Sequence, residues 1–261
     1  MPIPQITLGI VSCCRPTAAE RLLKSIIQHE PTLFQQIHLV NNSGITERKL
    51  NQEYRKLINV LSSNYLQIDY DEIHSCGPSE ARSYIADKFK SDYLLLLDDD
   101  LFIDGNSNLN AAVTALAEKN FAVLGGVWLE EKHSRAFGSN LKIINKSIFR
   151  YDIPPVTFAE VPFPVDIPQM SCFIRADVIR ECIWDKQFEF FFECMDFFMQ
   201  LKKKGLISYC MPNLMFKHDP ISYLSDLPNI RRAMKEEDKQ RFMEKWDLER
   251  MVRNGVVIYP S

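Results

Sequence analysis

Residues 91–100, with the sequence SDYLLLLDDD, limit the possible folds of this chain more than any other stretch. Four consecutive leucines behind a tyrosine predict a strand buried on both faces, as in a parallel sheet with helices on each side. The strand ends in three carboxylates, Asp98, Asp99 and Asp100, whose mutual repulsion costs stability unless a cation offsets it. Alternate side chains of an extended chain share a side, so Asp98 and Asp100 can both face one divalent cation. Because ligands of open α/β sheets bind beyond the carboxyl ends of the strands, the triplet predicts a functional site, with a solvated acidic loop as the alternative.

The composition is that of a globular protein, with 46% hydrophobic and 25% charged residues among 261. This length allows one domain with a single large core. A formal net charge of −3 argues against a polyanion-binding surface, so we expect no nucleic-acid partner. No apolar run approaches the roughly 20 residues that cross a bilayer, and the N-terminus lacks a signal pattern, so we expect a cytoplasmic protein without a transmembrane segment. The seven cysteines include no Cys-x-x-Cys pair, which favours reduced thiols over disulfides or zinc.

The first part of the chain predicts the element order β-α-β-α-β-α-β, which is typical of a doubly wound, mostly parallel α/β sheet. The expected strands are residues 5–13, 37–40, 65–70 and 91–98, and the expected helices begin near residues 15, 47 and 77. Right-handed crossovers bring the carboxyl ends of the first, second and fourth strands to one rim. We therefore interpret residues 1–105 as a Rossmann-like nucleotide-binding half.

The rest of the chain departs from strict alternation. Helices are expected at residues 108–119 and 176–182, and strands at 121–127, 142–144, 170–175 and 206–210. Prolines interrupt residues 130–165, but aromatic and aliphatic residues recur there, which argues against a linker. The chain is then one domain, 1–261, with a second half at 106–220 and a helical tail at 221–261.

A helix that carries acidic residues is expected within residues 188–205, where three lysines and Gly205 suit its C-terminal end. Apolar residues cover most of this helix and leave a narrow polar stripe at three- and four-residue spacing. The stripe consists of Glu193, Asp196, Gln200 and Lys203. Such a stripe on a buried helix faces either a cleft or solvent, and a solvated edge is the simpler alternative.

Several segments resemble, in order, the motifs of family 2 of the GT-A fold glycosyltransferases. They are IVSCCRP at residues 10–16, LVNNSG at 39–44, GPSEAR at 77–82 and the strand ending in Asp-Asp-Asp, which is similar to the family's Asp-x-Asp motif. Residues 188–205 resemble the family's Glu-Asp-x-Asp helix, and His218 follows that helix after a short strand. The resemblance covers nearly the whole chain and implies a GT-A fold and a nucleotide-sugar donor. It also implies that residues 106–220 are the acceptor-side half, with a smaller mixed sheet.

The resemblance also implies which residues bind the donor and its metal ion. The residues expected at the nucleotide and diphosphate are Ser12, Cys13, Arg15, Asn41, Asn42, Arg82, Asp98 and Asp99. Those expected at Mn²⁺ or Mg²⁺ are Asp98, Asp100 and His218. Asparagines 41 and 42 stand where the family usually has an acid that reads uracil, although an amide also offers a donor and an acceptor to a base. A UDP-sugar is the favoured donor on the weight of the family alone.

The catalytic base is where the chain departs from the family. Cys194 stands at the position of the usual catalytic Asp, and it falls on the apolar side of the predicted helix. The base must then be Glu193 or Asp196, and we favour Glu193, with inversion at the anomeric carbon.

The sequence thus predicts a metal-dependent glycosyltransferase that moves a sugar to the hydroxyl of a glycan or another acceptor. Two alternatives remain. A nucleotidyltransferase could use a carboxylate-bound metal, but it is expected to have a Gly-rich loop after the first strand, and residues 10–16 contain no glycine. A non-catalytic relative that binds nucleotide sugars or glycans would explain Cys194.

Overall fold

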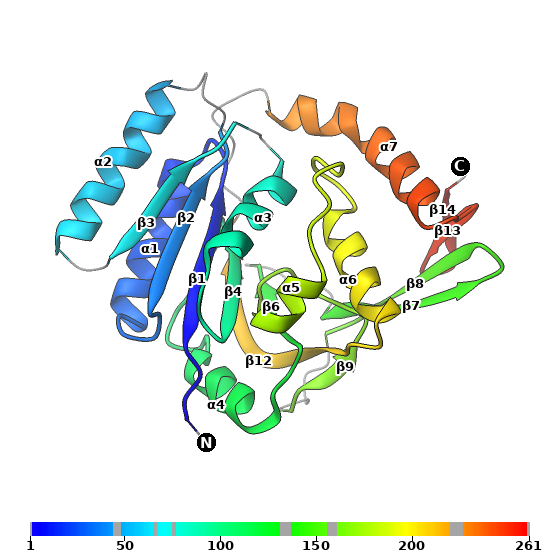
Figure 1. The fold of residues 1–261 in the computed structure, drawn as a ribbon, viewed down its shortest axis with the longest axis horizontal. Coiled ribbons are helices and arrows are strands. Elements are labelled where there is room, and N and C mark those ends of the chain that lie inside the picture. The colour runs from blue at the N-terminus through cyan, green and yellow to red at the C-terminus, as the bar shows by residue number, and fades with distance from the viewer. Residues whose placement is uncertain are drawn as a thin grey trace.

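The computed structural model describes residues 2–43, 48–64, 67–74, 77–130, 137–155, 161–219 and 227–259. Its first part contains four parallel strands in the order β3-β2-β1-β4. These are β1 (Ile6–Ser12), β2 (Gln36–Asn41), β3 (Ile68–Glu72) and β4 (Tyr93–Asp98). The helices between them are α1 (Pro16–His29), α2 (Arg48–Asn64) and α3 (Pro78–Lys88). The predicted order of strands and helices is therefore confirmed (Figure 1).

The second part extends the same sheet in the order β4-β11-β6-β12-β5. The added strands are β5 (Leu101–Phe102), β6 (Val123–Leu129), β9 (Phe163–Val165, paired with β12), β11 (Cys172–Arg175) and β12 (Ser208–His218). The added helices are α4 (Leu109–Lys119), α5 (Ala176–Glu181) and α6 (Glu193–Lys203). The four strands of the first part are parallel, but β11 runs antiparallel to both of its neighbours, so the whole sheet is mixed.

A smaller five-stranded sheet has the order β10-β7-β8-β13-β14. Its strands are β7 (Gly138–Ile144), β8 (Ser147–Ile153), β10 (Ile167–Pro168), β13 (Arg250–Arg253) and β14 (Val256–Tyr259). The sequence predicts a helical tail at residues 221–261. In the structure α7 (Leu227–Lys245) is helical, but a β-hairpin of β13 and β14 follows it. Asn254 and Gly255 both have positive φ, of 50° and 83°, which a tight two-residue hairpin turn requires. The Asn-Gly pair was a hairpin signal that the sequence analysis overlooked.

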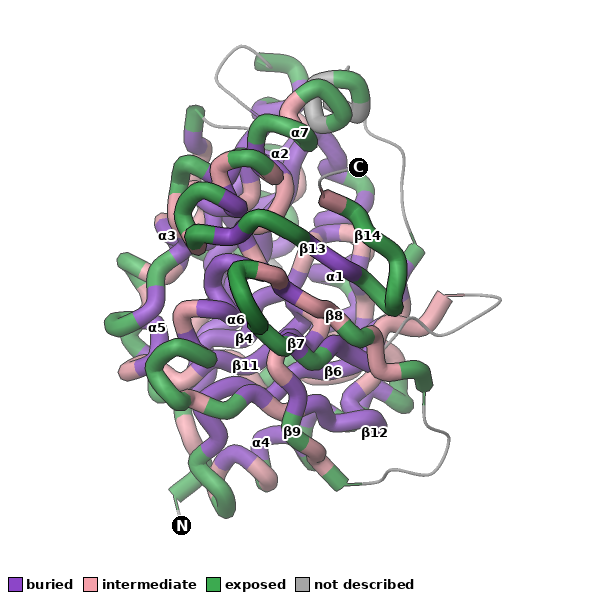
Figure 2. The backbone as a smooth tube through the Cα atoms, turned by 90° about the vertical axis from the view of Figure 1, so that its right-hand side faces the viewer, coloured by how far each residue is buried: buried purple, intermediate pink, exposed green. Residues whose placement is uncertain are grey.

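Helices cover both faces of the large sheet, as the leucine strand requires. Leu94 and Leu96 pack in a cluster that includes residues of α3, α5 and α6. Tyr93, Leu95 and Leu97 pack in a second cluster with residues of α1, α2 and α4. The predicted burial of β4 on both faces is confirmed. The three carboxylates follow at the carboxyl end of this buried strand. Figure 2 shows the buried strands inside, while β14 runs along the surface.

No helix among the described residues combines the length and the apolar character needed to cross a bilayer. The six cysteines within those residues are free thiols, in keeping with the reduced state expected from the sequence.

Close packing of α3 on β1 generates a testable prediction about stability. A Cβ added at Gly9 would lie 2.7 Å from Ile85 of α3 and 3.0 Å from Leu96 of β4. Gly9→Ala should therefore lower the free energy of unfolding by about 1–3 kcal/mol, as overpacking of a core does. Gly105→Ala is the control, because a Cβ there meets no atom within 4 Å. Urea denaturation of both variants measures the difference, and equal stabilities would contradict this packing.

Candidate active site

The three carboxylates at the end of β4 are bound by two arginines, one just before α1 and one on α3. Arg15, just before α1, forms ion pairs with Asp99 and with Asp100, the latter at 2.8 Å. Arg82, on α3, forms an ion pair of 3.1 Å with Asp98. The repulsion that the sequence predicts within the triplet is thus offset by two guanidinium groups of the protein itself.

Asp99 is the structural member of the triplet, since it is fully buried. Ser12 at the end of β1 donates a hydrogen bond of 2.6 Å to it, and the Ser12 and Tyr54 hydroxyls lie 2.5 Å apart. Burial raises the pKa of Asp99 to about 7, although the charge of Arg15 lowers it. Tyr54 also accepts a hydrogen bond of 3.0 Å from the backbone N–H of Arg15. These contacts join the ends of β1 and β4 to α2 and place Arg15 at the rim.

Asp100 faces His218, the last residue of β12, with 3.7 Å between the carboxylate and Nε2. Pairing of β12 with β5 brings them together, because the backbone N–H of Asp219 donates to the carbonyl of Asp100. Burial opposes ionisation of Asp100, but the nearby His218 imidazole and the charge of Arg15 hold its pKa below the usual value. The sequence placed both residues in one metal site, and the structure makes them neighbours.

Two residues that the sequence analysis missed orient His218. Glu130, directly after β6, lies 2.8 Å from Nδ1, and the ring of Trp128 stacks on the imidazole with centroids 4.9 Å apart. A carboxylate at Nδ1 keeps a proton on that nitrogen and leaves Nε2 directed toward Asp100. Only the parallel pairing of β6 with β12 signals this contact, because Phe216 lies opposite Trp128 in the register.

The residues fit a divalent cation that takes most of its ligands from a substrate. Within the described residues no three His, Cys, Asp or Glu side chains form a ready metal cluster. Asp100 and the His218 Nε2 offer one oxygen and one nitrogen ligand side by side. Mg²⁺ sites commonly use one or two carboxylates and complete the coordination with phosphate oxygens and water.

Arg82 connects the end of β4 with the start of α6. Its guanidinium is 4% exposed and binds Asp98 on one side and, at 3.0 Å, Glu193 on the other. It also donates to the Cys194 sulfur at 3.2 Å, and that thiol lies 3.2 Å from the Glu193 carboxylate. Burial disfavours the charged guanidinium, yet the nearby Cys194, Asp98 and Glu193 raise the pKa of Arg82, and burial raises the pKa of the Cys194 thiol. Cys194 therefore belongs to this polar cluster, which differs from the apolar setting expected from the sequence.

The polar stripe of α6 is buried at its N-terminal end. The helix begins at Glu193, after Phe192 with a φ of 64°, and not several residues earlier as the sequence suggested. Glu193 is 8% exposed and Asp196 is fully buried, which excludes a solvated edge for these two. Asp196 accepts hydrogen bonds of 2.9 Å from Lys245 and 2.8 Å from Trp246. Asp196 therefore joins α6 to the end of α7.

A second buried carboxylate joins the middle of α7 to the residues just before α6. Asp238 accepts hydrogen bonds of 3.3, 3.0 and 2.9 Å from the backbone N–H groups of Glu189, Phe190 and Phe191. Asp238 is fully buried. No local pattern in the sequence marks this residue, because its partners lie almost fifty positions earlier.

The expected nucleotide-binding turns lie at the rim, and their side chains hold the turns in shape. Asn41 donates to Asn51 at 2.8 Å and accepts a hydrogen bond from the backbone of Ser43 at 3.0 Å. Asn42 donates to the carbonyl of Gly77 at 3.2 Å and accepts at its own carbonyl from Cys13. Both asparagines are 1% exposed, so they shape this surface more than they extend from it.

Comparison with solved structures identifies the fold. Over 92% of this chain and 50% of the matched chain, the structure is similar to GalNAc-T7 with UDP, GalNAc and Mn²⁺, with a TM-score of 0.62 and 15% identity. It is also similar to S. aureus TarS (TM-score 0.56, 13% identity, 83% of this chain and 37% of that one). The complex of TarS 1–349 with UDP-GlcNAc matches with a TM-score of 0.55 and 14% identity, over 85% of this chain and 61% of that one. The chain therefore has the GT-A fold, and it spans less than two thirds of the length of each of these structures.

No protein-family model matches the sequence, and no curated protein matches it by sequence. At 13 to 15% identity the structural matches establish the fold only.

The central position of Arg82 leads to a prediction about stability. Arg82→Met leaves Asp98 and Glu193 without their shared cation, so the free energy of unfolding should fall by about 3–5 kcal/mol, as for other broken buried ion pairs. Arg55→Met is the control: Arg55 pairs with Glu72, but its side chain is 61% exposed, and the unfolding midpoint should hardly change. Thermal and urea unfolding measure both variants. An Arg82→Met protein as stable as wild type would show that the cluster is not held by charge.

Proposed function

We propose that this protein is a metal-dependent glycosyltransferase that moves a sugar from a nucleotide-sugar donor to an acceptor hydroxyl. One observation carries the proposal: at the carboxyl end of β4, Arg82 connects Asp98 to Glu193 while Asp100 faces His218. A candidate metal pair and a candidate base are thus positioned around one strand end of a GT-A fold, where such sheets bind their ligands.

The proposed donor is a UDP-sugar. The matched GalNAc-T7 structure contains UDP, and a matched TarS structure contains UDP-GlcNAc. In this chain the nucleotide would lie against Ser12, Cys13 and Arg15, next to the turn at Asn41 and Asn42. Because the amides of that turn already hold it in shape, we expect base recognition to depend on the form of the turn.

The proposed cation is Mn²⁺ or Mg²⁺, held by Asp100 and His218, with Asp98 close enough to contribute through the ribose or the metal shell. When bound, such an ion neutralises charge on the leaving diphosphate. Glu130 and Trp128 serve this site by fixing the orientation of the imidazole. Arg82 holds the Asp98 carboxylate in a fixed position.

Glu193 is the proposed general base. The acceptor oxygen attacks the anomeric carbon, the bond from that carbon to the diphosphate oxygen breaks, and the hydroxyl proton passes to the Glu193 carboxylate, with inversion. Asp196, one turn later on α6, keeps the helix in place through Lys245 and Trp246. The Cys194 thiol stays protonated because burial raises its pKa, so it donates to Glu193 and does not compete as a base.

A non-catalytic relative that binds nucleotide sugars is the second candidate, and Cys194 at the position of the family's usual acid favours it. Slow hydrolysis of a UDP-sugar in the presence of Mn²⁺ separates the two. An enzyme releases UDP, whereas a binding protein retains the intact donor.

The metal pair predicts how nucleotide binding depends on the cation. Asp100→Ala should abolish the Mn²⁺-dependent part of UDP binding, because it removes the oxygen ligand beside His218. Glu130→Gln should weaken that part by about 10–100-fold, the usual effect of losing the carboxylate behind a ligating histidine. Titration calorimetry with UDP, with and without Mn²⁺, measures both. Asp177→Ala, which removes an ion pair with Arg175 and a backbone hydrogen bond at the start of α5, is the control. Asp100→Ala binding as tightly as wild type would refute the assignment.

The base assignment predicts a graded effect on turnover. Glu193→Gln keeps the shape and loses the proton acceptor, so turnover should fall by about two to four orders of magnitude with little change in donor affinity. Asp196→Asn should cost less turnover, because it acts through the position of α6. Cys194→Ser should mainly change stability. If Glu193→Gln stays active while Asp196→Asn is inactive, the base is Asp196.

A further inference from the structure

A second polar region lies on one face of the parallel strands, away from the carboxylates. Side chains facing α1 and α2 are apolar: Ile6 and Leu8 of β1, Ile37 and Leu39 of β2, and Ile68 of β3. The alternate positions face the side of α3, as Gly9 does in its contact with Ile85. Toward the amino ends of the strands, the side chains on that face are polar: Thr7, Gln36, His38, Asp69 and Asp71. Parallel sheets are normally apolar on both faces, so this arrangement calls for an explanation.

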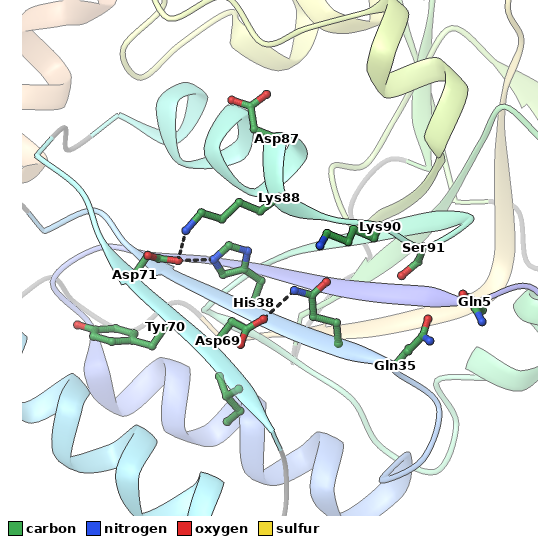
Figure 3. A pocket seen from close by; sticks show the side chains of 12 residues that line it. Gln5, Gln35, His38, Asp69, Tyr70, Asp71, Asp87, Lys88, Lys90 and Ser91 are labelled. Carbon is green, nitrogen blue, oxygen red and sulfur yellow. Dashed lines mark hydrogen bonds and ion pairs between the residues drawn. The ribbon is translucent and has the colours of Figure 1, made fainter.

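Of these side chains, all but Thr7 line a pocket of about 890 Å³. That volume lies within the range of small-molecule sites, roughly 300–1,000 Å³. Figure 3 shows the side chains of Asp69 and Asp71 on β3 and His38 on β2 lying below Lys88 at the end of α3. Gln5 and Gln35, which precede β1 and β2, close one end. The pocket therefore lies toward the amino ends of the strands, whereas the candidate active site is at their carboxyl ends.

His38 is the least expected group in this pocket. It is 1% exposed, and its Nε2 lies 2.7 Å from the Asp71 carboxylate, which also accepts hydrogen bonds of 2.9 Å from Tyr84 and from Lys88. Burial opposes ionisation of Asp71, but these hydrogen bonds hold its pKa below the usual value, so the Nε2 atom of His38 carries the donated proton. In the neutral imidazole the other ring nitrogen, Nδ1, is an acceptor.

The Nδ1 atom of His38 finds no hydrogen-bond partner in the described part of the chain, although it is buried. A buried acceptor without a partner lowers the stability of the folded protein. The Lys88 side chain, which bridges to the same carboxylate, is 43% exposed and can shift to admit a ligand. A hydroxyl group that donates to Nδ1 would remove this cost.

The remaining lining restricts the class of ligand. Gln35, Gln36 and Ser91 offer neutral donors and acceptors, and Asp69 accepts a hydrogen bond of 2.7 Å from Gln36. The lining contains three carboxylates and two lysines, namely Asp69, Asp71, Asp87, Lys88 and Lys90. When His38 is neutral, the pocket carries one net negative charge, which disfavours an anion. Few apolar side chains line the pocket, which disfavours a lipid or a stacked base. Uncharged compounds rich in hydroxyl groups match such a surface.

We propose that this pocket is a second binding site, separate from the transfer centre, for a neutral oligosaccharide. One sugar hydroxyl donates to the His38 Nδ1, and others bind Asp69 and the amides of Gln35 and Gln36. The site does not depend on the proposed transfer reaction.

The experiment is a glycan-array screen of the full chain, followed by calorimetric titration of the neutral glycans that bind. Gln36→Ala combined with Asp69→Ala should weaken their binding at least tenfold. Gln240→Ala combined with Glu244→Ala is the matched control, because it removes an equivalent hydrogen-bonded pair of 2.8 Å on the surface of α7, and binding should not change. The ¹⁵N resonance of the His38 Nδ1 should move when the glycan binds.

Three results would overturn the proposal: no neutral glycan binds, the Gln36 and Asp69 double variant binds as wild type does, or acidic glycans bind more tightly than neutral ones. UDP with Mn²⁺ should leave glycan binding unchanged, and displacement by UDP would place the glycan in the transfer centre instead. Should the protein fail to bind UDP at all, the proposed function falls while this site stands on its own titration.

Discussion

One buried arginine, Arg82, joins the two parts of this molecule into one site. It extends from α3 in the first part of the chain and ends between Asp98 of β4 and Glu193 of α6. A guanidinium can bind two carboxylates at once in a fixed plane, which a lysine cannot do equally well. The same contact pairs both carboxylates with one cation and ties the strand end to the helix. The geometry of the candidate site therefore depends on a residue that has no proposed part in proton transfer.

The helix that carries Glu193 is held by a clamp from the end of the chain. Asp238 binds the backbone before α6, and Asp196 within α6 binds Lys245 and Trp246 at the end of α7. Each carboxylate is fully buried and satisfied by several donors, so each contact is specific in direction. The tail then continues into β13, which pairs with β8. The C-terminal segment is thus a structural part of the site and not an appendage.

The candidate metal pair is positioned by the pairing of neighbouring strands. Asp100 directly precedes β5 and His218 ends β12; these two strands pair antiparallel, and the backbone N–H of Asp219 donates a hydrogen bond to the carbonyl of Asp100. Glu130 and Trp128 come from the strand on the other side of β12 and orient the imidazole. A sheet is a suitable base for such a site because its register sets which side chains are neighbours. The GT-A fold shared with GalNAc-T7 and TarS at about 15% identity or less shows how far side chains can diverge on such a frame.

The sequence by itself determined the local structure: the leucine strand with its carboxylates, the alternation of strands and helices, and the presence of an acidic helix within residues 188–205, although not its start at Glu193. These follow from periodicity and from turn residues, which act over a few positions of the chain. The tertiary structure decided which of those groups meet. Arg82 and Glu193 are 111 residues apart, and Glu130 and His218 are 88 apart. Such contacts depend on the register between strands and on the packing of helices, neither of which leaves a local pattern. For the same reason the roles of Asp196 and Asp238, and the buried polar face around His38, appeared only once the chain was folded.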